Sequence, residues 1–224
     1  MKTISFESID STNTYLKKLK KPTEETLIIA KKQTGGRGTK GRSFICEEGG
    51  VYLSLLRLYP CKAEESFSIM MNSAVAVVKT LSAFDVKAKI KWPNDIIVNG
   101  KKICGILIEN VFEGDFVSRS VVGIGLNVNN PISAEIRDIA ISAKEVLNKE
   151  LPIESLIATL VYNLYKPTSY GEYKKLLLYL GEEVTVITPT SSYNAIIEDV
   201  TENGNLKTSK GEVLSSAEIS IRRV

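Results

Sequence analysis

The sequence of 224 residues contains no histidine and only three cysteines. Catalytic triads and general bases that depend on histidine are therefore excluded, as are the metalloprotease motifs. The cysteines, Cys46, Cys61 and Cys104, are too few and too scattered for a disulfide framework or a four-thiolate zinc site. Any chemistry must rest on lysine, arginine, carboxylates and backbone groups.

Long apolar runs are missing as well. None approaches the roughly 20 residues of a membrane span, and residues 1–7 do not have the pattern of a signal peptide. We therefore expect a cytoplasmic protein without membrane contact. With 43% hydrophobic and 25% charged residues, the composition is typical of soluble globular proteins, and the length predicts one sizeable domain, alone or with a small appendage.

The hydrophobic periodicity predicts an α+β fold with a mixed, mostly antiparallel sheet flanked by helices. Three- and four-residue spacing of apolar side chains predicts helices over 63–84, 156–164 and 173–180. Another helix is expected to begin at Ser11 and to run to about Lys20. Strands are expected over 2–9, 26–31, 51–56, 87–91 and 116–128, with a hairpin over 95–110 that turns at Asn99-Gly100.

After Gly181 the pattern changes to short strands separated by glycine turns, over 184–187, 193–200, 206–208 and 217–221. We therefore predict a main domain over residues 1–180 and a small β-barrel over 181–224. Charge divides at the same place. Residues 1–180 hold 25 basic and 19 acidic residues, a net charge of +6, whereas 181–224 hold four basic and seven acidic residues, a net charge of −3.

Basic residues concentrate in one glycine-rich loop. Residues 26–46 contain five basic residues and no acidic one. Residues 36–41 fit the pattern GxGxxG, but a strand and not a helix follows, which excludes a dinucleotide-binding turn, and the loop does not fit a Walker loop either. A flexible basic loop can close over an anionic ligand. The alternative is a solvated surface loop with incidental charge.

Two more segments place polar residues at strand ends. The segment Lys91-Trp92-Pro93-Asn94-Asp95 ends a strand at a proline and exposes Lys91, Asn94 and Asp95. Lys102 opens the apolar strand 103–109, in which Gly105 indicates the close approach of another group. The alternative for such a lysine is an exposed strand end without a function.

These segments resemble the biotin protein ligases. The similar segments follow the order of that family over about 120 residues and comprise 11–13, Gln33 with 36–42, 91–95, 102–109 and 123–127. The resemblance implies a class II synthetase-like biotin/lipoate ligase fold, with a catalytic domain over 1–180 and an SH3-like barrel over 181–224. It also implies a two-step reaction. Biotin and MgATP form biotinyl-5′-AMP, and a lysine of a biotin carboxyl carrier protein then takes the biotin.

The resemblance also implies roles for single residues. Lys102 is expected to be the main catalytic residue, together with Arg37 and Lys91. The residues expected to bind biotin are Ser11, Thr12, Asn13, Gln33, Gly36, Arg37, Gly38, Thr39, Lys102, Gly105, Gly123 and Gly125. Those expected to bind ATP are Arg37, Arg42, Phe44, Lys91, Asn94 and Asn127. Asp95 is a candidate base for the incoming lysine, and Mg²⁺ is expected with ATP, although no metal ligand is assigned.

Two residues depart from the family pattern. Thr39 stands where many members have a second loop arginine, which predicts weaker retention of the adenylate. Phe44 stands where a tryptophan is usual, and it is expected to stack with a smaller face.

Two other functions stay open. A lipoate protein ligase has the same fold and adenylate chemistry, although its loop is expected to precede a histidine. A non-catalytic biotin or nucleotide sensor would bind ligand without turnover. We expect no DNA binding, since no helix-turn-helix precedes Ser11, while an exposed sheet edge could support a homodimer or the docking of a carrier strand.

Overall fold

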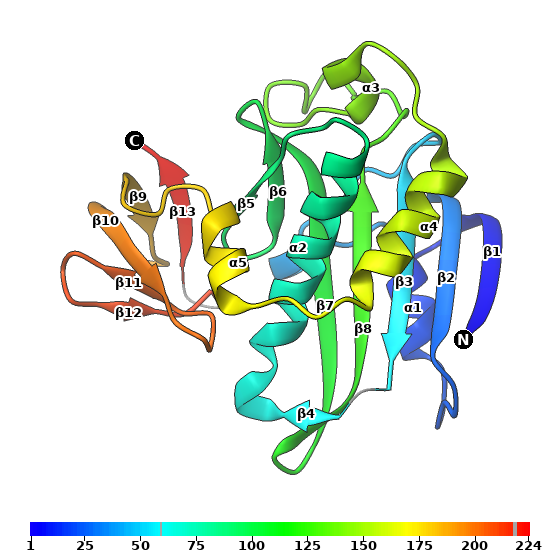
Figure 1. Ribbon diagram of the computed structural model, residues 1–224, viewed down its shortest axis with the longest axis horizontal. Helices are drawn as coiled ribbons and strands as arrows, with labels where there is room; N and C mark the ends of the chain where they lie inside the picture. The colour runs from blue at the N-terminus through cyan, green and yellow to red at the C-terminus, as the bar shows by residue number, and fades with distance from the viewer. Residues whose placement is uncertain (59, 217–218) are drawn as a thin grey trace.

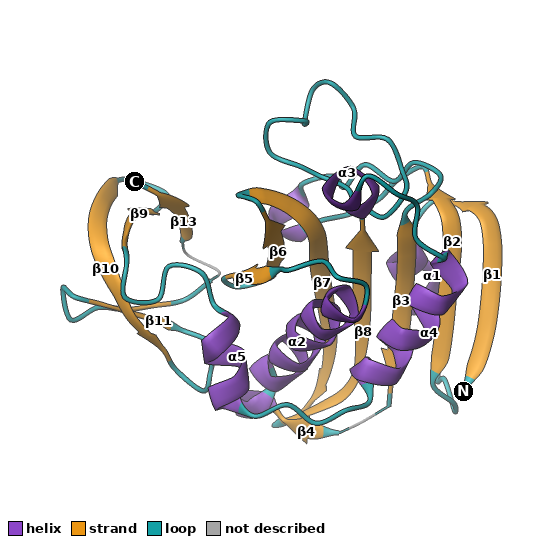
Figure 2. Ribbon diagram, turned by 45° about the horizontal axis from the view of Figure 1, so that its top comes forward, coloured by secondary structure: helices purple, strands orange, loops and turns teal. Residues whose placement is uncertain are grey.

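The computed structural model of the chain contains two β-sheets, with helices packed on the larger one (Figures 1 and 2). It describes residues 1–58, 60–216 and 219–224. The strands of the larger sheet are β1 (Lys2–Ile9), β2 (Thr26–Gln33), β3 (Val51–Arg57), β4 (Cys61–Lys62), β5 (Lys89–Lys91), β6 (Asp95–Val98), β7 (Lys101–Glu113) and β8 (Phe116–Leu126).

The order of the larger sheet is β1-β2-β3-β8-β7-β6-β5, with β4 beside β8. Strands β1 and β2 run parallel and the other pairs run antiparallel. The predicted mixed, mostly antiparallel sheet is thereby confirmed. The turn between β6 and β7 lies at Asn99 and Gly100, which both have positive φ, as a type I′ turn requires.

Helices cover both faces of the larger sheet (Figures 1 and 2). Helices α2 (Phe67–Ala83), α4 (Ile153–Leu164) and α5 (Tyr170–Leu176) pack together on one face, and α1 (Thr12–Lys17) contacts β2, β3 and β8 on the other. The remaining helices are short: α3 (Ala143–Leu147) and the 3₁₀ turns Thr39–Gly41 and Ala63–Glu65.

Side-chain alternation along β3 separates the two faces. Leu53 and Leu55 join the core beneath α2, whereas Leu56 packs with Leu16 of α1. Ser54, between the two leucines, is therefore directed to the α1 face, where the polar residues described below gather. The segment 63–83 is long and apolar enough to cross a membrane by length and composition, but α2 is the core helix of this sheet, with Ser73 and Leu81 both buried.

Two helices end earlier than predicted. Helix α1 ends at Lys17 and not near Lys20; Lys18 is its C-cap, and Lys21 has a φ of 48°. Helix α5 ends at Leu176, because Leu177 is extended and pairs with Ile90 of β5. Backbone pairing with the sheet therefore overrides the helical spacing that continues to Leu180.

The second sheet is antiparallel and lies at the C-terminal end of the chain. Its strands are β9 (Glu183–Ile187), β10 (Ser192–Val200), β11 (Leu206–Thr208), β12 (Val213–Leu214) and β13 (Ser220–Arg223), in the order β12-β11-β10-β9-β13. This arrangement is consistent with the predicted SH3-like barrel. The strand expected over 217–221 lies partly outside the described residues, at 217–218, and the domain division at residue 180 stays a prediction.

Hydrogen bonds join the two sheets. The indole Nε1 of Trp92 donates to the carbonyl of Gly204 at 2.8 Å, and both groups are buried. The chain passes from one sheet to the other through Gly181, whose N–H donates to the carbonyl of Ile197 at 2.8 Å. The segment 91–95, which ends β5 and begins β6, is thus anchored against the second sheet.

Candidate active site

A cavity of about 740 Å³ opens beside α1 on the larger sheet. It is lined by all but one of the residues that the sequence assigned to biotin or ATP, namely Ser11, Thr12, Asn13, Gln33, Arg37, Gly38, Thr39, Arg42, Phe44, Lys91, Asn94, Lys102, Gly105, Gly123, Gly125 and Asn127. Gly36 is the exception. A Cβ atom there would lie 2.3 Å from the carbonyl oxygen of Phe44 and 2.6 Å from Sγ of Cys46, so this glycine lets the loop pack against itself behind the cavity wall.

The beginning of α1 forms a polar end of the cavity. Ser11 caps the helix, its side chain accepting a backbone N–H. Thr12 donates through its N–H and Oγ1 to Oε1 of Gln33, at 2.8 and 3.0 Å. Ser54, fully buried on β3, donates to Oγ1 of Thr12 at 2.7 Å and to Oδ1 of Asn13. Ser54 has a single hydroxyl proton, which the two acceptors share, so Ser54 links Thr12 and Asn13 in one hydrogen-bond network.

The amide of Asn13 is held from three sides. Its Nδ2 donates to Oε2 of Glu109 at 3.0 Å and to the carbonyl of Leu107 at 3.4 Å. Gly123 of β8 lies directly beneath it, since a Cβ atom there would be 2.0 Å from Oδ1 of Asn13. Gly123 therefore makes room for a side chain of the protein, and both amide protons of Asn13 are already bonded within the protein.

Two paired glycines form the floor of the middle of the cavity. Gly105 of β7 lies opposite Gly125 of β8. A Cβ atom at Gly125 would lie 2.8 Å from the ring of Phe44, and one at Gly105 would lie 3.0 Å from Nζ of Lys102. The glycines thus let Phe44 and Lys102 lie flat on the sheet.

Lys102 is paired with Asp95 across the β6–β7 hairpin. Its Nζ lies 2.7 Å from Oδ1 of Asp95 and 5.7 Å from the centre of the Phe44 ring. The side chains of Lys102 and Asp95 are 33% and 24% exposed, so the ammonium remains accessible from the cavity. Asp95, the candidate base, is engaged as the counter-ion of Lys102.

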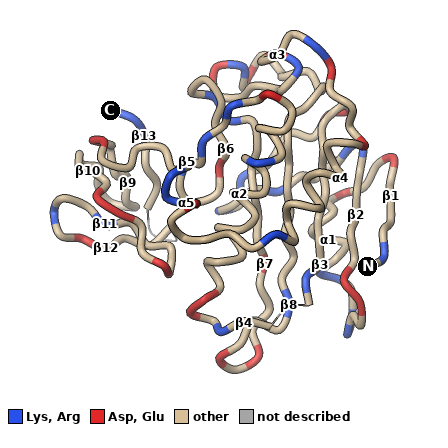
Figure 3. Tube along the Cα trace, in the orientation of Figure 1, with Lys and Arg blue, Asp and Glu red and all other residues tan. Residues whose placement is uncertain are grey.

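Positive charges surround Lys91 at the other end of the cavity. Burial lowers the pKa of Lys91, and the charges of Lys102, Arg222 and Arg42 lower it further, while Asp95 opposes them. Arg222 belongs to β13, and Figure 3 marks the basic residues of β5 and β13. The second sheet therefore contributes a cation to the cavity.

The glycine loop connects this cationic end to both sheets. Arg42 donates to the carbonyl and to Oγ1 of Thr39, at 3.4 Å each. Nζ of Lys40 donates to the carbonyl of Ile219, just before β13, at 3.0 Å. Arg37 is half-exposed at the mouth of the cavity. The loop is thus ordered by its own residues and by the second sheet.

The asparagines assigned to ATP mainly hold the backbone in place. Nδ2 of Asn94 donates to the carbonyl of Ile106 at 2.9 Å, and Nδ2 of Asn127 donates to that of Ile141 at 3.3 Å. Asn130, which the sequence pattern missed, donates to Oδ1 of Asn127 at 3.1 Å. These bonds fix the walls of the cavity, and each asparagine retains capacity for a ligand.

Several residues of the site were not assigned a role from the sequence. Asn130 and Arg222 line the cavity, whereas Ser54 and Glu109 bond to Thr12 and Asn13, which line it. Glu109 ends the segment 102–109 and is the one member that the family pattern could have indicated.

A family model named "Biotin/lipoate A/B protein ligase family" matches residues 5–127. The chain belongs to this family. The matched residues include α1, the glycine loop and β3 to β8, which together form most of the cavity.

Two relatives show the extent of the sequence similarity. The "Bifunctional ligase/repressor BirA" of Bacillus subtilis (strain 168) is 40% identical over 133 residues, which are 57% of this chain and 41% of that protein. The "Biotin--[acetyl-CoA-carboxylase] ligase" of Paracoccus denitrificans is 32% identical over 104 residues, 45% of this chain and 43% of that protein. The similarity thus spans less than half the length of each relative.

The fold of this ligase-family chain also matches a solved structure over its whole length. The biotin protein ligase from Aquifex aeolicus, in complex with biotin and ATP, superposes with a TM-score of 0.83 at 29% identity and covers 100% of this chain and 99% of that one. Among residues 1–58, 60–216 and 219–224, no cluster of three or more histidine, cysteine or acidic residues is placed to hold a metal ion.

Proposed function

We propose that this chain is a biotin protein ligase, an enzyme that activates biotin with MgATP and transfers it to a lysine of a biotin carboxyl carrier protein. The observation that carries the proposal is the linear order of groups in one cavity. A polar end at Asn13, the glycine floor of β7 and β8 and the Lys102 ammonium follow one another, and the charges of Lys102, Arg42 and Arg222 act together on Lys91 in the same cavity.

The strand register gives the length of this order. Asn13 lies over Gly123, which is opposite Leu107, and Nζ of Lys102 lies over Gly105, which is opposite Gly125. The two groups are therefore separated along the sheet by two residues of strand. Two residues span about 7 Å. This separation suits a ligand with a polar ring at one end and a carboxylate at the other. In the proposal, the hydroxyl of Ser11 and the side-chain amide of Gln33, whose Nε2 also donates to Sγ of Cys46 at 3.1 Å, meet the ring.

The chemistry requires cations more than a base. A carboxylate oxygen attacks the α-phosphorus of ATP, the bond to the bridging oxygen breaks, and pyrophosphate leaves. Because the acid is already ionised at neutral pH, the barrier lies in bringing it against a polyphosphate. Lys102, Lys91 and Arg42 supply preorganised positive charge for that step, with Arg37 at the mouth of the cavity. Mg²⁺ enters as part of the MgATP substrate, bound mainly by phosphate and water oxygens.

In the second step, the amine of the acceptor lysine attacks the acyl carbon, AMP leaves, and the amine loses a proton. The carboxylate of Asp95 is paired with Nζ of Lys102 at 2.7 Å. In the proposal, it accepts this proton only after Lys102 has turned toward the departing AMP.

The names of the relatives favour biotin over lipoate, although the family includes both activities. The Paracoccus relative is named for the carboxylase that it modifies, and the Aquifex protein was solved with biotin and ATP. These names also support the biotin carboxyl carrier protein as acceptor. We propose that the acceptor docks on the edge of β7 beyond Ile106, whose N–H and carbonyl both bond to Asn94. Among the described strands, only β8 pairs with β7 in that part.

The test is release of pyrophosphate from ATP with biotin as the only other substrate, followed by transfer of labelled biotin to a purified carrier domain. We expect both with biotin and neither with lipoate. Binding of biotin without pyrophosphate release would support a sensor, and release with lipoate alone would support a lipoate ligase.

A cytoplasmic location, the absence of DNA and membrane binding, and a homodimer through the same sheet edge stay predictions.

A further inference from the structure

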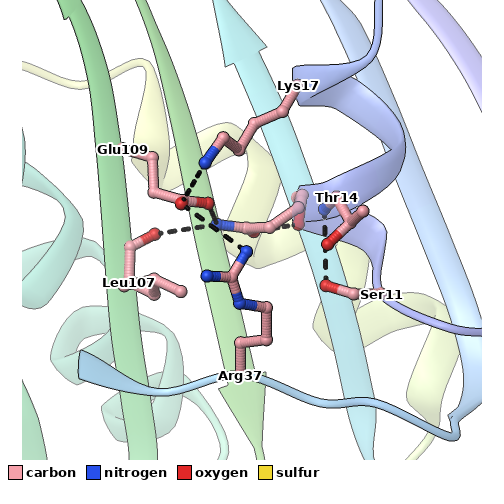
Figure 4. A network of polar contacts seen from close by, with 8 residues as sticks. Ser11, Thr14, Lys17, Arg37, Leu107 and Glu109 are labelled. Atoms are coloured by element: carbon pink, nitrogen blue, oxygen red, sulfur yellow. Dashed lines mark hydrogen bonds and ion pairs between the residues drawn. The ribbon is translucent and has the colours of Figure 1, made fainter. Parts of the chain in front are cut away.

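Beside the cavity, Glu109 contacts Asn13 and Lys17 of α1 and Arg37 of the glycine loop (Figure 4). It projects from β7 and is only 18% exposed. Its Oε2 accepts the bond from Asn13 at 3.0 Å. Its Oε1 lies 2.7 Å from Nζ of Lys17, at the end of α1, and 3.9 Å from Nη1 of Arg37 in the glycine loop.

The carboxylate is ionised in this environment. Burial raises the pKa of Glu109, but hydrogen bonds from Lys17 and Asn13, together with the charges of Lys17 and Arg37, lower it by more, so the pKa lies below the ordinary value. The two oxygens therefore carry a full negative charge at neutral pH. Both oxygens contact α1, and Oε1 also approaches the glycine loop.

The two oxygens divide the contacts between the two ends of the ligand site. Oε2 fixes the amide of Asn13, whose Oδ1 is fixed in turn by Ser54. Oε1 attracts Arg37, the loop residue expected at the phosphate. Lys17 is the counter-ion that keeps this carboxylate neutralised, independently of the position of Arg37.

We infer that Glu109 is a positioning residue that sets Asn13 and Arg37 relative to each other, so that one carboxylate aligns the ring-binding and phosphate-binding ends of the cavity. The inference rests on the proposed function for its kinetic consequences. Glutamine is nearly isosteric but has a single acceptor oxygen and no charge, so it can serve Asn13 or Arg37 but not both.

The experiment compares Glu109→Gln, Lys17→Met and a control, Glu150→Gln, in biotin-dependent pyrophosphate release. Glu150 pairs with Lys144 at 2.8 Å and does not line the cavity, so its replacement removes an ion pair of similar length elsewhere. We expect KM for biotin to rise about ten-fold in Glu109→Gln, as the loss of one charge-assisted bond implies, and to rise less in Lys17→Met. Melting temperatures should match that of the control.

A merely structural role would lower the melting temperature and the active fraction of Glu109→Gln while leaving KM for biotin unchanged, and that result would overturn the inference. A second measurement does not depend on activity. Limited trypsin treatment should cut after Arg37 faster in Glu109→Gln than in wild type or in Glu150→Gln. If wild type released no pyrophosphate, the proposed function would fail, and the cleavage rates would still decide whether Glu109 holds Arg37. Equal rates would refute it.

Discussion

Nζ of Lys102 lies 2.7 Å from Oδ1 of Asp95 across the β6–β7 hairpin. The pair is partly exposed, and Asp95 follows the buried segment that Trp92 ties to the second sheet. A lysine held in this way loses little conformational freedom when a ligand arrives, which is the condition for electrostatic stabilisation without reorganisation.

Replacement of Lys102 by alanine should reduce biotin-dependent pyrophosphate release by about 100-fold or more, because the charge beside the reacting oxygens is lost. The control is Lys101→Ala. Lys101 is the neighbouring lysine, its Nζ donates to the carbonyl of Arg137 at 2.6 Å, and it does not line the cavity. Near-normal turnover in Lys102→Ala, measured on folded protein, would show that the lysine is not catalytic.

The alkaline limit of activity should reflect Lys91. Its pKa is below the ordinary lysine value of 10.5, chiefly because of burial, and only the protonated form attracts phosphate. Below that pKa, kcat/KM for ATP should be constant, and it should fall as the pH rises through it. Since arginine keeps its charge, Lys91→Arg should move the fall to higher pH. Lys89→Arg, on the same strand, is the control, and identical alkaline limits in all three proteins would exclude Lys91 as the titrating group.

Arg222 should act on ATP and not on biotin, because it lies at the cationic end with Lys91 and not at the polar end with Asn13. We expect Arg222→Met to raise KM for ATP by about ten-fold, the effect of one lost contact to a charged group, with KM for biotin unchanged. Arg223→Met is a matched control, since Arg223 is the next residue of β13 and does not line the cavity. Equal values of KM for ATP in the two variants would remove Arg222 from the ATP site.

Thr39→Arg should slow the release of biotinyl-adenylate by about three-fold, as a partly exposed charge contact implies. Thr39 lines the cavity and also accepts a bond from Arg42, so its replacement changes two things. Thr39→Val, which removes only the hydroxyl, separates them. The measurement is the rate of free adenylate release after rapid removal of ATP, and release as fast as in wild type would show that the missing arginine is irrelevant to retention.

The elements with strong periodicity could be predicted from the sequence, and all but one of the residues predicted to bind biotin or ATP line the cavity. The hairpin at Asn99 and Gly100 is set by local turn chemistry, and α2 is set by its apolar spacing. Where α5 was predicted too long, a distant partner decided the outcome. Leu177 leaves its helix because Ile90 pairs with it, and nothing near residue 177 encodes that contact.

The same reason explains the site residues that were missed. Ser54 sits within an apolar strand and acquires a role only because the order of strands brings it beneath α1. Arg222 is far from the glycine loop in sequence, and it reaches the cavity because the second sheet packs against the segment 91–95. Gly36 shows the opposite case, in which a residue of a recognisable pattern serves the packing of the loop.

The chain has a single tryptophan, and that residue, Trp92, is 3% exposed with its indole bonded to the carbonyl of Gly204. Its fluorescence therefore comes from one place, the seam between the two sheets. Separation of the second sheet would expose the indole to water and shift its emission to longer wavelength. The protein thus carries an intrinsic optical probe for the attachment of the sheet that supplies Arg222, readable without any label.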